Sequence, residues 1–124
     1  MSLDVRLQGE SVTEDCECTC GHKHTRTETV RLYDANITHN LNAMAGVAGV
    51  YQALWRPEEI GVTHAKQLIP LLRQGLDRLL EDPKKFEPYN PKNGWGSYSG
   101  LVSFAKGYLA ACEEYPDATV YVSR

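Results

Sequence analysis

One stretch of the chain, residues 34–59, most constrains what it can fold into. It reads DANITHNLNAMAGVAGVYQALWRPEE, and its large apolar residues recur at intervals of three or four positions. Such intervals place a single apolar stripe along one face of an α-helix. We therefore predict a helix at about residues 36–55, ended by Pro57. The stripe consists of Ile37, Leu41, Met44, Val47 or Ala48, Tyr51 and Trp55.

The polar residues beside this stripe differ from those of an ordinary surface helix. Asn36, His39 and Asn40 would share one face of the first two turns. The other end carries a second polar group, formed by Arg56, Glu58 and Glu59. Amide, imidazole, guanidinium and carboxylate groups together suit the recognition of a small polar molecule. A simpler interpretation stays open, in which Asn36 caps the helix and His39 and Asn40 bond to a neighbouring loop.

Length and charge limit the class of protein. At 124 residues the chain suits one domain with a single modest core. A net charge of −3 without a run of Lys or Arg argues against broad binding to nucleic acids or anionic membranes. No apolar run approaches the roughly 20 residues of a membrane span. Residues 1–10 lack the apolar centre of a signal peptide, so we expect a cytoplasmic protein with reduced cysteines.

Apolar periodicity along the chain predicts an α+β fold. Strands are expected at residues 3–8, 25–33 and 118–123, and helices at about residues 36–55, 63–81 and 99–115. The last strand is expected to pair with residues 27–33. The prediction is a small antiparallel sheet, made of an N-terminal hairpin and a C-terminal strand, covered by three α-helices. Residues 1–124 then form one domain, with a hairpin region at 1–33 and a helical region with the terminal strand at 34–124.

The predicted hairpin tip carries a run of thiols and imidazoles, CECTCGHKH at residues 16–24. These are the ligands of tetrahedral zinc, although the usual spacing is Cys-x-x-Cys. Alternate residues on one strand face lie about 6–7 Å apart, so a turn at residues 20–21 is needed to gather them. We predict a possible structural zinc held by Cys18, Cys20, His22 and His24. The alternative is a polar tip with adventitious metal affinity.

A long irregular segment, residues 81–100, is rich in proline and glycine but also carries aromatic residues. Loops of this length are usually functional or disordered, and aromatic rings favour function. Asn93, Trp95 and Tyr98 are therefore candidate ligand contacts. An indole ring can stack on a base or sugar, and an amide can both donate and accept hydrogen bonds. Trp95 could equally anchor the loop to the core.

The sequence gives little support for catalysis. Phosphate-binding glycine loops and familiar hydrolase motifs are absent from it. His39 is the candidate general base, paired with Glu58 or Glu59. On a continuous helix His39 and Glu58 would lie about 28 Å apart. They could meet only across an oligomer interface or if the helix breaks at Gly46 or Gly49.

Four motifs resemble a family of small phage- and prophage-encoded proteins. They are Asn-Ile-Thr-His-Asn-Leu at 36–41, Trp-Arg-Pro-Glu-Glu at 55–59, Asn-Gly-Trp-Gly-x-Tyr at 93–98 and Pro-Asp-Ala at 116–118. The resemblance covers residues 33–124 and implies that the four motifs form one site. By analogy with compact phage proteins that sequester a nucleotide second messenger, it implies a nucleotide-like ligand and action in the cytoplasm of a bacterial host.

Three functions are compatible with these observations. We favour a homo-oligomeric binding protein that captures a nucleotide-like ligand. Asn36, His39 and Asn40 would read its polar edges, Trp95 would stack on it and Arg56 would contact phosphate. The second is a hydrolase of such a ligand with His39 as base. The third is a zinc-stabilised module that binds a host protein.

Overall fold

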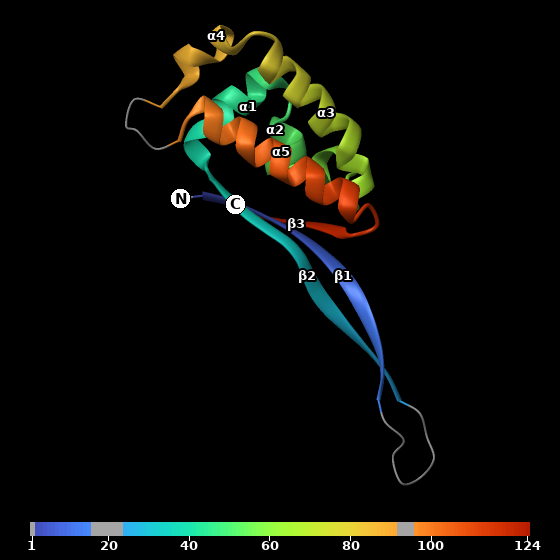
Figure 1. Ribbon diagram of the computed structural model, residues 1–124. Coiled ribbons are helices and arrows are strands. Elements are labelled where there is room, and N and C mark those ends of the chain that lie inside the picture. Colours follow the sequence, from blue (N-terminus) through green and yellow to red (C-terminus); the bar gives the residue numbers. More distant parts are fainter. Residues whose placement is uncertain (1, 16–23, 92–95) are drawn as a thin grey trace.

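The computed structural model describes residues 2–15, 24–91 and 96–124 (Figure 1). Within these residues an antiparallel sheet lies beneath a layer of helices, which confirms the predicted α+β class. The predicted hairpin tip at residues 19–22 lies outside the described residues.

Three strands form the sheet, in the spatial order β2-β1-β3. They are β1 (Ser2–Asp15), β2 (His24–Thr38) and β3 (Thr119–Ser123). The strand β3 pairs with residues 4–8 of β1 and not with β2, so the predicted pairing of the terminal strand was wrong. Alternating apolar residues show which face of a strand is buried, but they carry no information about which strand lies beside it. Tertiary contacts decide which strand is the neighbour. Val120 N donates to Thr63 O at 2.9 Å, and this bond holds β3 beside the segment that leads into the helix Ala65–Glu81.

The hairpin of β1 and β2 continues past the end of β3 as a two-stranded ribbon. Residues 9–15 of β1 pair with residues 24–30 of β2, and Figure 1 shows this ribbon projecting away from the helices. At the base of the ribbon the register shifts between Leu7 and Gln8, which pair with Tyr33 and Arg31. This bulge leaves Leu32 as the extra residue of β2, and such an insertion increases local twist.

The helical layer contains five α-helices and three short 3₁₀ segments within the described part of the chain. In chain order they are η1 (His39–Leu41), α1 (Asn42–Ala48), α2 (Tyr51–Trp55), η2 (Pro57–Ile60), α3 (Ala65–Glu81), α4 (Pro83–Phe86), η3 (Glu87–Tyr89) and α5 (Tyr98–Glu114). The two long helices, α3 and α5, pack against each other, and α5 also contacts β2. Leu3, Val5 and Leu7 of β1 are fully buried and form the sheet side of the core.

The single helix predicted at residues 36–55 is wrong, because this stretch forms a strand end and three shorter helical pieces. Residues 36–38 extend β2, and Thr38 Oγ1 accepts a hydrogen bond from Asn40 N at 3.3 Å where η1 begins. The helix α1 ends at Gly49, whose φ of +79° is one that glycine adopts without steric cost. The apolar spacing still identified buried residues, including Met44 and Trp55, but spacing alone does not reveal a break.

The break is fixed by its contact with α3. A Cβ atom built on Gly75 would lie 1.8 Å from Val50 Cγ1, so the missing side chain of Gly75 is what makes room for Val50. Arg78 Nη1 donates to Ala48 O at 3.3 Å and places a cation at the carboxyl end of α1. Two features of α3, the Arg78 side chain and the space left by Gly75, therefore hold the turn between α1 and α2.

The remaining helices agree broadly with the sequence patterns. The helix α3 begins at Ala65, after a cap in which Gln67 Oε1 accepts from His64 N at 2.9 Å, and it continues through Pro70. Leu80, near its end, is half exposed. The segment 81–100 is partly helical, since α4 and η3 lie within it and Phe86 is buried.

We predict that Gly75→Ala destabilises the protein by about 1–3 kcal/mol, because the added methyl group would overlap Val50. The change raises intrinsic helix propensity by only about 1 kcal/mol, which is too little to offset the overlap. Urea denaturation measures the free energy of unfolding.

Gly46→Ala in α1 is the matched control, because no atom lies within 4 Å of its added Cβ, and it should leave stability unchanged or slightly increased. In a Val50→Ala background the cost of Gly75→Ala should shrink. Equal costs in the two backgrounds would contradict the proposed contact.

Candidate functional site

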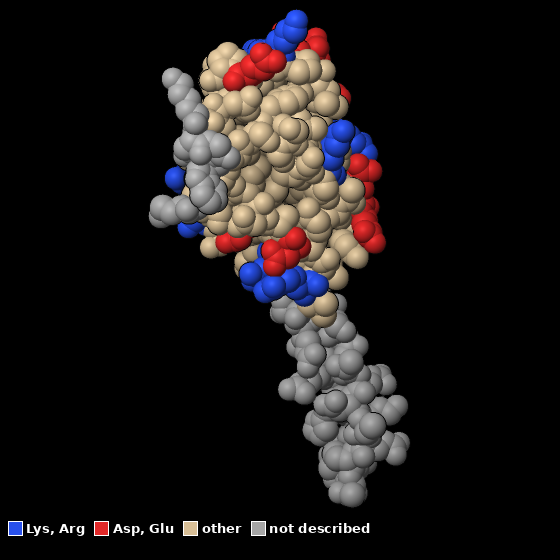
Figure 2. Space-filling view, turned by 60° about the vertical axis from the view of Figure 1, so that its left-hand side comes forward, with Lys and Arg blue, Asp and Glu red and all other residues tan. Residues whose placement is uncertain are grey.

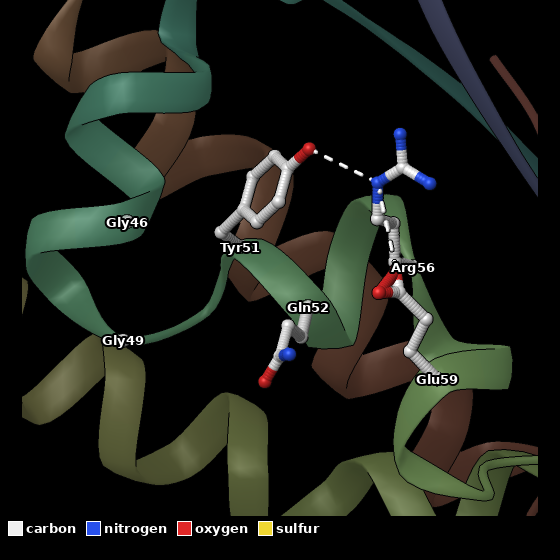
Figure 3. A pocket seen from close by; sticks show the side chains of 6 residues that line it. All are labelled: Gly46, Gly49, Tyr51, Gln52, Arg56 and Glu59. Atoms are coloured by element: carbon white, nitrogen blue, oxygen red, sulfur yellow. Dashed lines mark hydrogen bonds and ion pairs between the residues drawn. The ribbon is translucent and has the colours of Figure 1, made fainter.

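A surface hollow of about 310 Å³ lies where α1, α2 and η2 meet (Figure 3). It is lined by Gly46, Gly49, Tyr51, Gln52, Arg56 and Glu59. The break at Gly49 creates it, because α2 departs from the line of α1 and two positions of the wall have no side chain. We call it the Arg56 hollow.

Arg56 is held at one edge of the hollow by two neighbours. Its Nε donates to Tyr51 Oη at 3.3 Å and lies 3.6 Å from Glu59 Oε2. The pKa of Arg56 is raised, first by the hydrogen bond to Tyr51 and then by the charges of Tyr51 and Glu59. Its two terminal nitrogens have no hydrogen-bond or ion-pair partner among the described residues, and Figure 3 shows them directed away from both neighbours. The planar fork is therefore free to bind an anion.

Tyr51 is backed by a stack of rings. Its ring lies over Trp55 with centroids 5.6 Å apart and planes 18° apart. Trp55 is buried, and its Nε1 donates to His39 Nδ1 at 2.9 Å. Because an indole N–H can only donate, His39 Nδ1 must be an acceptor and a neutral His39 carries its proton on Nε2. His39 thus positions Trp55, which in turn supports the ring at the hollow.

Glu58 points to a different neighbour. Arg124 Nη1 donates to Trp55 O at 2.8 Å and also to the Glu58 carboxylate. This hydrogen bond from Arg124 is the main reason that the pKa of Glu58 is lowered, followed by a backbone hydrogen bond of Glu58 itself. Glu58 therefore ties the end of the chain after β3 to η2 and does not line the Arg56 hollow.

Of the residues predicted to form one site, Arg56 and Glu59 line the Arg56 hollow, and His39 reaches it indirectly through Trp55. Asn36 does not reach it. It is the third residue from the end of the sheet pairing, and its Nδ2 donates to Asp4 Oδ1 at 2.7 Å and Ser2 Oγ at 2.8 Å on β1. Asn40 is exposed in η1 and is not part of the hollow's lining.

Tyr98, the first residue of α5, has a structural role. Its hydroxyl donates to Leu79 O, and its ring stacks on Phe86 with centroids 5.9 Å apart. Asn93 and Trp95, and the proposed zinc ligands Cys18, Cys20 and His22, lie outside the described residues. His24 is described only as the first residue of β2. The zinc site and the loop contacts therefore remain predictions.

Sequence reasoning missed Tyr51 and Gln52 as site residues and Arg124 as a partner of Glu58. Tyr51 had been assigned only to the apolar stripe, yet its position one turn before Trp55 and five residues before Arg56 was a usable signal. Arg124 gave no local signal, because its contact with Glu58 joins residues 66 positions apart.

The geometry does not favour an acid–base pair of His39 and Glu58. The helix does break at Gly49, as that pair required, but His39 Nδ1 accepts from Trp55 and Glu58 is bound by Arg124. In the part of the chain that the structure describes, no group of three or more His, Cys, Asp or Glu residues is arranged to hold a metal ion. Nor does that part contain a helix with the length and apolar character needed to span a membrane.

Comparison with known proteins identified no matching family model, curated protein or solved structure. The assignment of a function therefore rests on the residues and geometry of this chain.

We predict that Arg124→Gln raises the pKa of Glu58 towards that of an ordinary glutamate, because it removes the main cause of the lowered value. Folding favours the charged form of a group with a lowered pKa, so this contribution to stability is complete above the ordinary glutamate pKa. It is lost as the pH falls through the lowered value. Since Glu58 is half exposed, the contribution should be below about 1 kcal/mol.

Titration of the Glu58 carboxyl group by carbon-13 NMR measures this pKa. Arg73→Gln on α3 is a suitable control, since Arg73 pairs with Glu113 and not with Glu58, and it should leave the titration unchanged. Identical Glu58 titrations in the wild type and Arg124→Gln would contradict the assignment.

Proposed function

We propose that this protein captures a small anionic, ring-bearing molecule of nucleotide type in the Arg56 hollow and releases it unchanged. The observation that carries the proposal is the fixed Arg56 guanidinium. Tyr51 and Glu59 engage its Nε, and its two terminal nitrogens have no partner among the described residues. A planar fork of this kind matches the oxygens of a phosphate group.

The surroundings of Arg56 support a nucleotide-like ligand. Tyr51 offers a ring beside the guanidinium, and rings of bases stack on aromatic side chains. Gln52 and Glu59 supply acceptors for the hydroxyl groups of a sugar. The volume, about 310 Å³, is at the lower end of the roughly 300–1,000 Å³ range of small-molecule sites.

A polymeric nucleic acid is a poorer candidate than a single nucleotide. On the face shown in Figure 2, the described Lys and Arg side chains lie beside Asp and Glu side chains and form no broad basic area. The chain as a whole carries a net charge of −3. Binding along a phosphate backbone would require a basic surface.

The resemblance to phage-encoded proteins extends this proposal to a biological role. Sequestration of a nucleotide signal of the bacterial host would need tight binding and no turnover. The arrangement around His39 supports binding without turnover, because its Nδ1 is occupied by Trp55 and Glu58 is engaged by Arg124. A homo-oligomer in the host cytoplasm belongs to the same proposal.

We predict that Arg56→Gln weakens binding of a nucleoside 5′-monophosphate at least about tenfold, since a hydrogen bond to a charged group contributes about 1.5–3 kcal/mol. Isothermal titration calorimetry with the monophosphates of adenosine, guanosine, cytidine and uridine measures this affinity, with inorganic phosphate as a fifth probe.

Arg73→Gln is the matched control, because Arg73 is also a partly exposed arginine 3.6 Å from a glutamate, and it should bind as the wild type does. Failure of all five probes to bind the wild type, or equal affinity in Arg56→Gln, would overturn the proposal. Phosphorus-31 NMR of the bound probe separates the two functional classes: an intact probe supports capture, and a product that disappears in His39→Ala supports a hydrolase.

A further inference from the structure

Among the described residues, the helices cover one face of the sheet, and the other face carries polar side chains (Figure 1). In β1 the buried residues Leu3, Val5 and Leu7 face the helices, so the alternating residues Asp4, Arg6 and Gln8 face away from them. The registers place each of these between a residue of β2 and a residue of β3. The three rows are Asn36–Asp4–Ser123, Asp34–Arg6–Tyr121 and Arg31–Gln8–Thr119. We call this surface the open sheet face.

A second hollow, of about 230 Å³, lies on this face and is lined by Asp4, Arg6, Tyr121, Val122 and Ser123. Arg6 is partly buried at its centre and has no hydrogen-bond or ion-pair partner among the described residues. The two neighbouring carboxylates each have a partner within the chain, since Asp4 accepts from Asn36 and Asp34 pairs with Arg31 at 3.0 Å. Each can still accept further hydrogen bonds. Of the four charged side chains Asp4, Arg6, Arg31 and Asp34, only Arg6 therefore has no hydrogen-bond or ion-pair partner among the described residues.

Tyr121 lies directly opposite Arg6 and is 52% exposed, the highest value among the large apolar side chains of the described residues. Arginine and tyrosine are the residue types that most often dominate the free energy of protein–protein contacts. A sheet surface with an exposed ring and a guanidinium that has no partner among the described residues suits a protein partner better than a small ligand.

We propose that the open sheet face packs against the same face of a second copy of this chain. The charged residues in these three rows are Asp4, Asp34, Arg6 and Arg31, and their charges sum to zero. Two copies of a chain with a net charge of −3 can therefore bring these rows together without net repulsion between them. In a two-fold arrangement, Arg6 of each copy donates to Asp4 or Asp34 of the other, and both contacts form at once.

The projecting ribbon supports the same arrangement. The part of the face backed by helices measures only about 17 by 14 Å, from five residues along and three strands across. That is small against the roughly 800 Å² that each partner buries in a standard interface. With 14 residues, β1 is about 48 Å long, so the paired backbone of the sheet continues well beyond the part backed by helices. An isolated two-stranded ribbon is only marginally stable, and a facing copy would cover it.

Sedimentation velocity over a range of concentrations tests this proposal. We expect the wild type to form a dimer at micromolar concentration, and added salt should weaken it because Arg6 contributes a charged contact. Arg6→Glu and Tyr121→Thr should each weaken the dimer at least tenfold. Arg73→Glu, which reverses a charge on the opposite, helical layer, should leave it unchanged.

Circular dichroism verifies that each variant remains folded, and threonine is chosen at position 121 because it suits a strand. A monomeric wild type overturns the proposal, even if the open sheet face binds a different protein. A dimer that persists unchanged in both Arg6→Glu and Tyr121→Thr overturns it as well. Neither outcome decides whether the Arg56 hollow binds a nucleotide, because the two hollows share no lining residue.

Discussion

The insertion of Val50 into the space above Gly75 is the contact on which the rest of the structure depends. It stops α1, starts α2 in a new direction and docks both on α3. A side chain on Gly75 would exclude Val50, and a side chain on Gly49 would be strained by its positive φ and would meet Arg78. Two glycines, far apart in the chain, thus determine one turn.

That turn determines the chemistry of the candidate site. Because α2 leaves the line of α1, Trp55 returns to His39, and Tyr51 stacks on Trp55 beside Arg56. On a continuous helix His39 and Trp55, 16 residues apart, would lie about 24 Å from each other. The break therefore converts a long apolar stripe into a small ring stack with a cation at its edge.

The sheet separates polar groups that are close in sequence. Asn36 and His39 are three residues apart, yet Asn36 bonds to Asp4 and Ser2 on β1 while His39 bonds to Trp55 of α2. The strand β2 ends between them, at Thr38. The motif at residues 36–41 thus contributes Asn36 to the open sheet face and His39 to the ring stack that supports the Arg56 hollow.

The sequence by itself determined the α+β class and the approximate positions of the long helices at residues 65–81 and 98–114. It also singled out Arg56 and Glu59, which line the same hollow. These follow from local periodicity and from the chemistry of individual side chains. Only the tertiary structure decided that β3 pairs with β1, that the helix expected at residues 36–55 is broken, and that Arg124 binds Glu58. Each of these depends on contacts between distant residues, such as Val50 with Gly75, whose pairing no local pattern encodes.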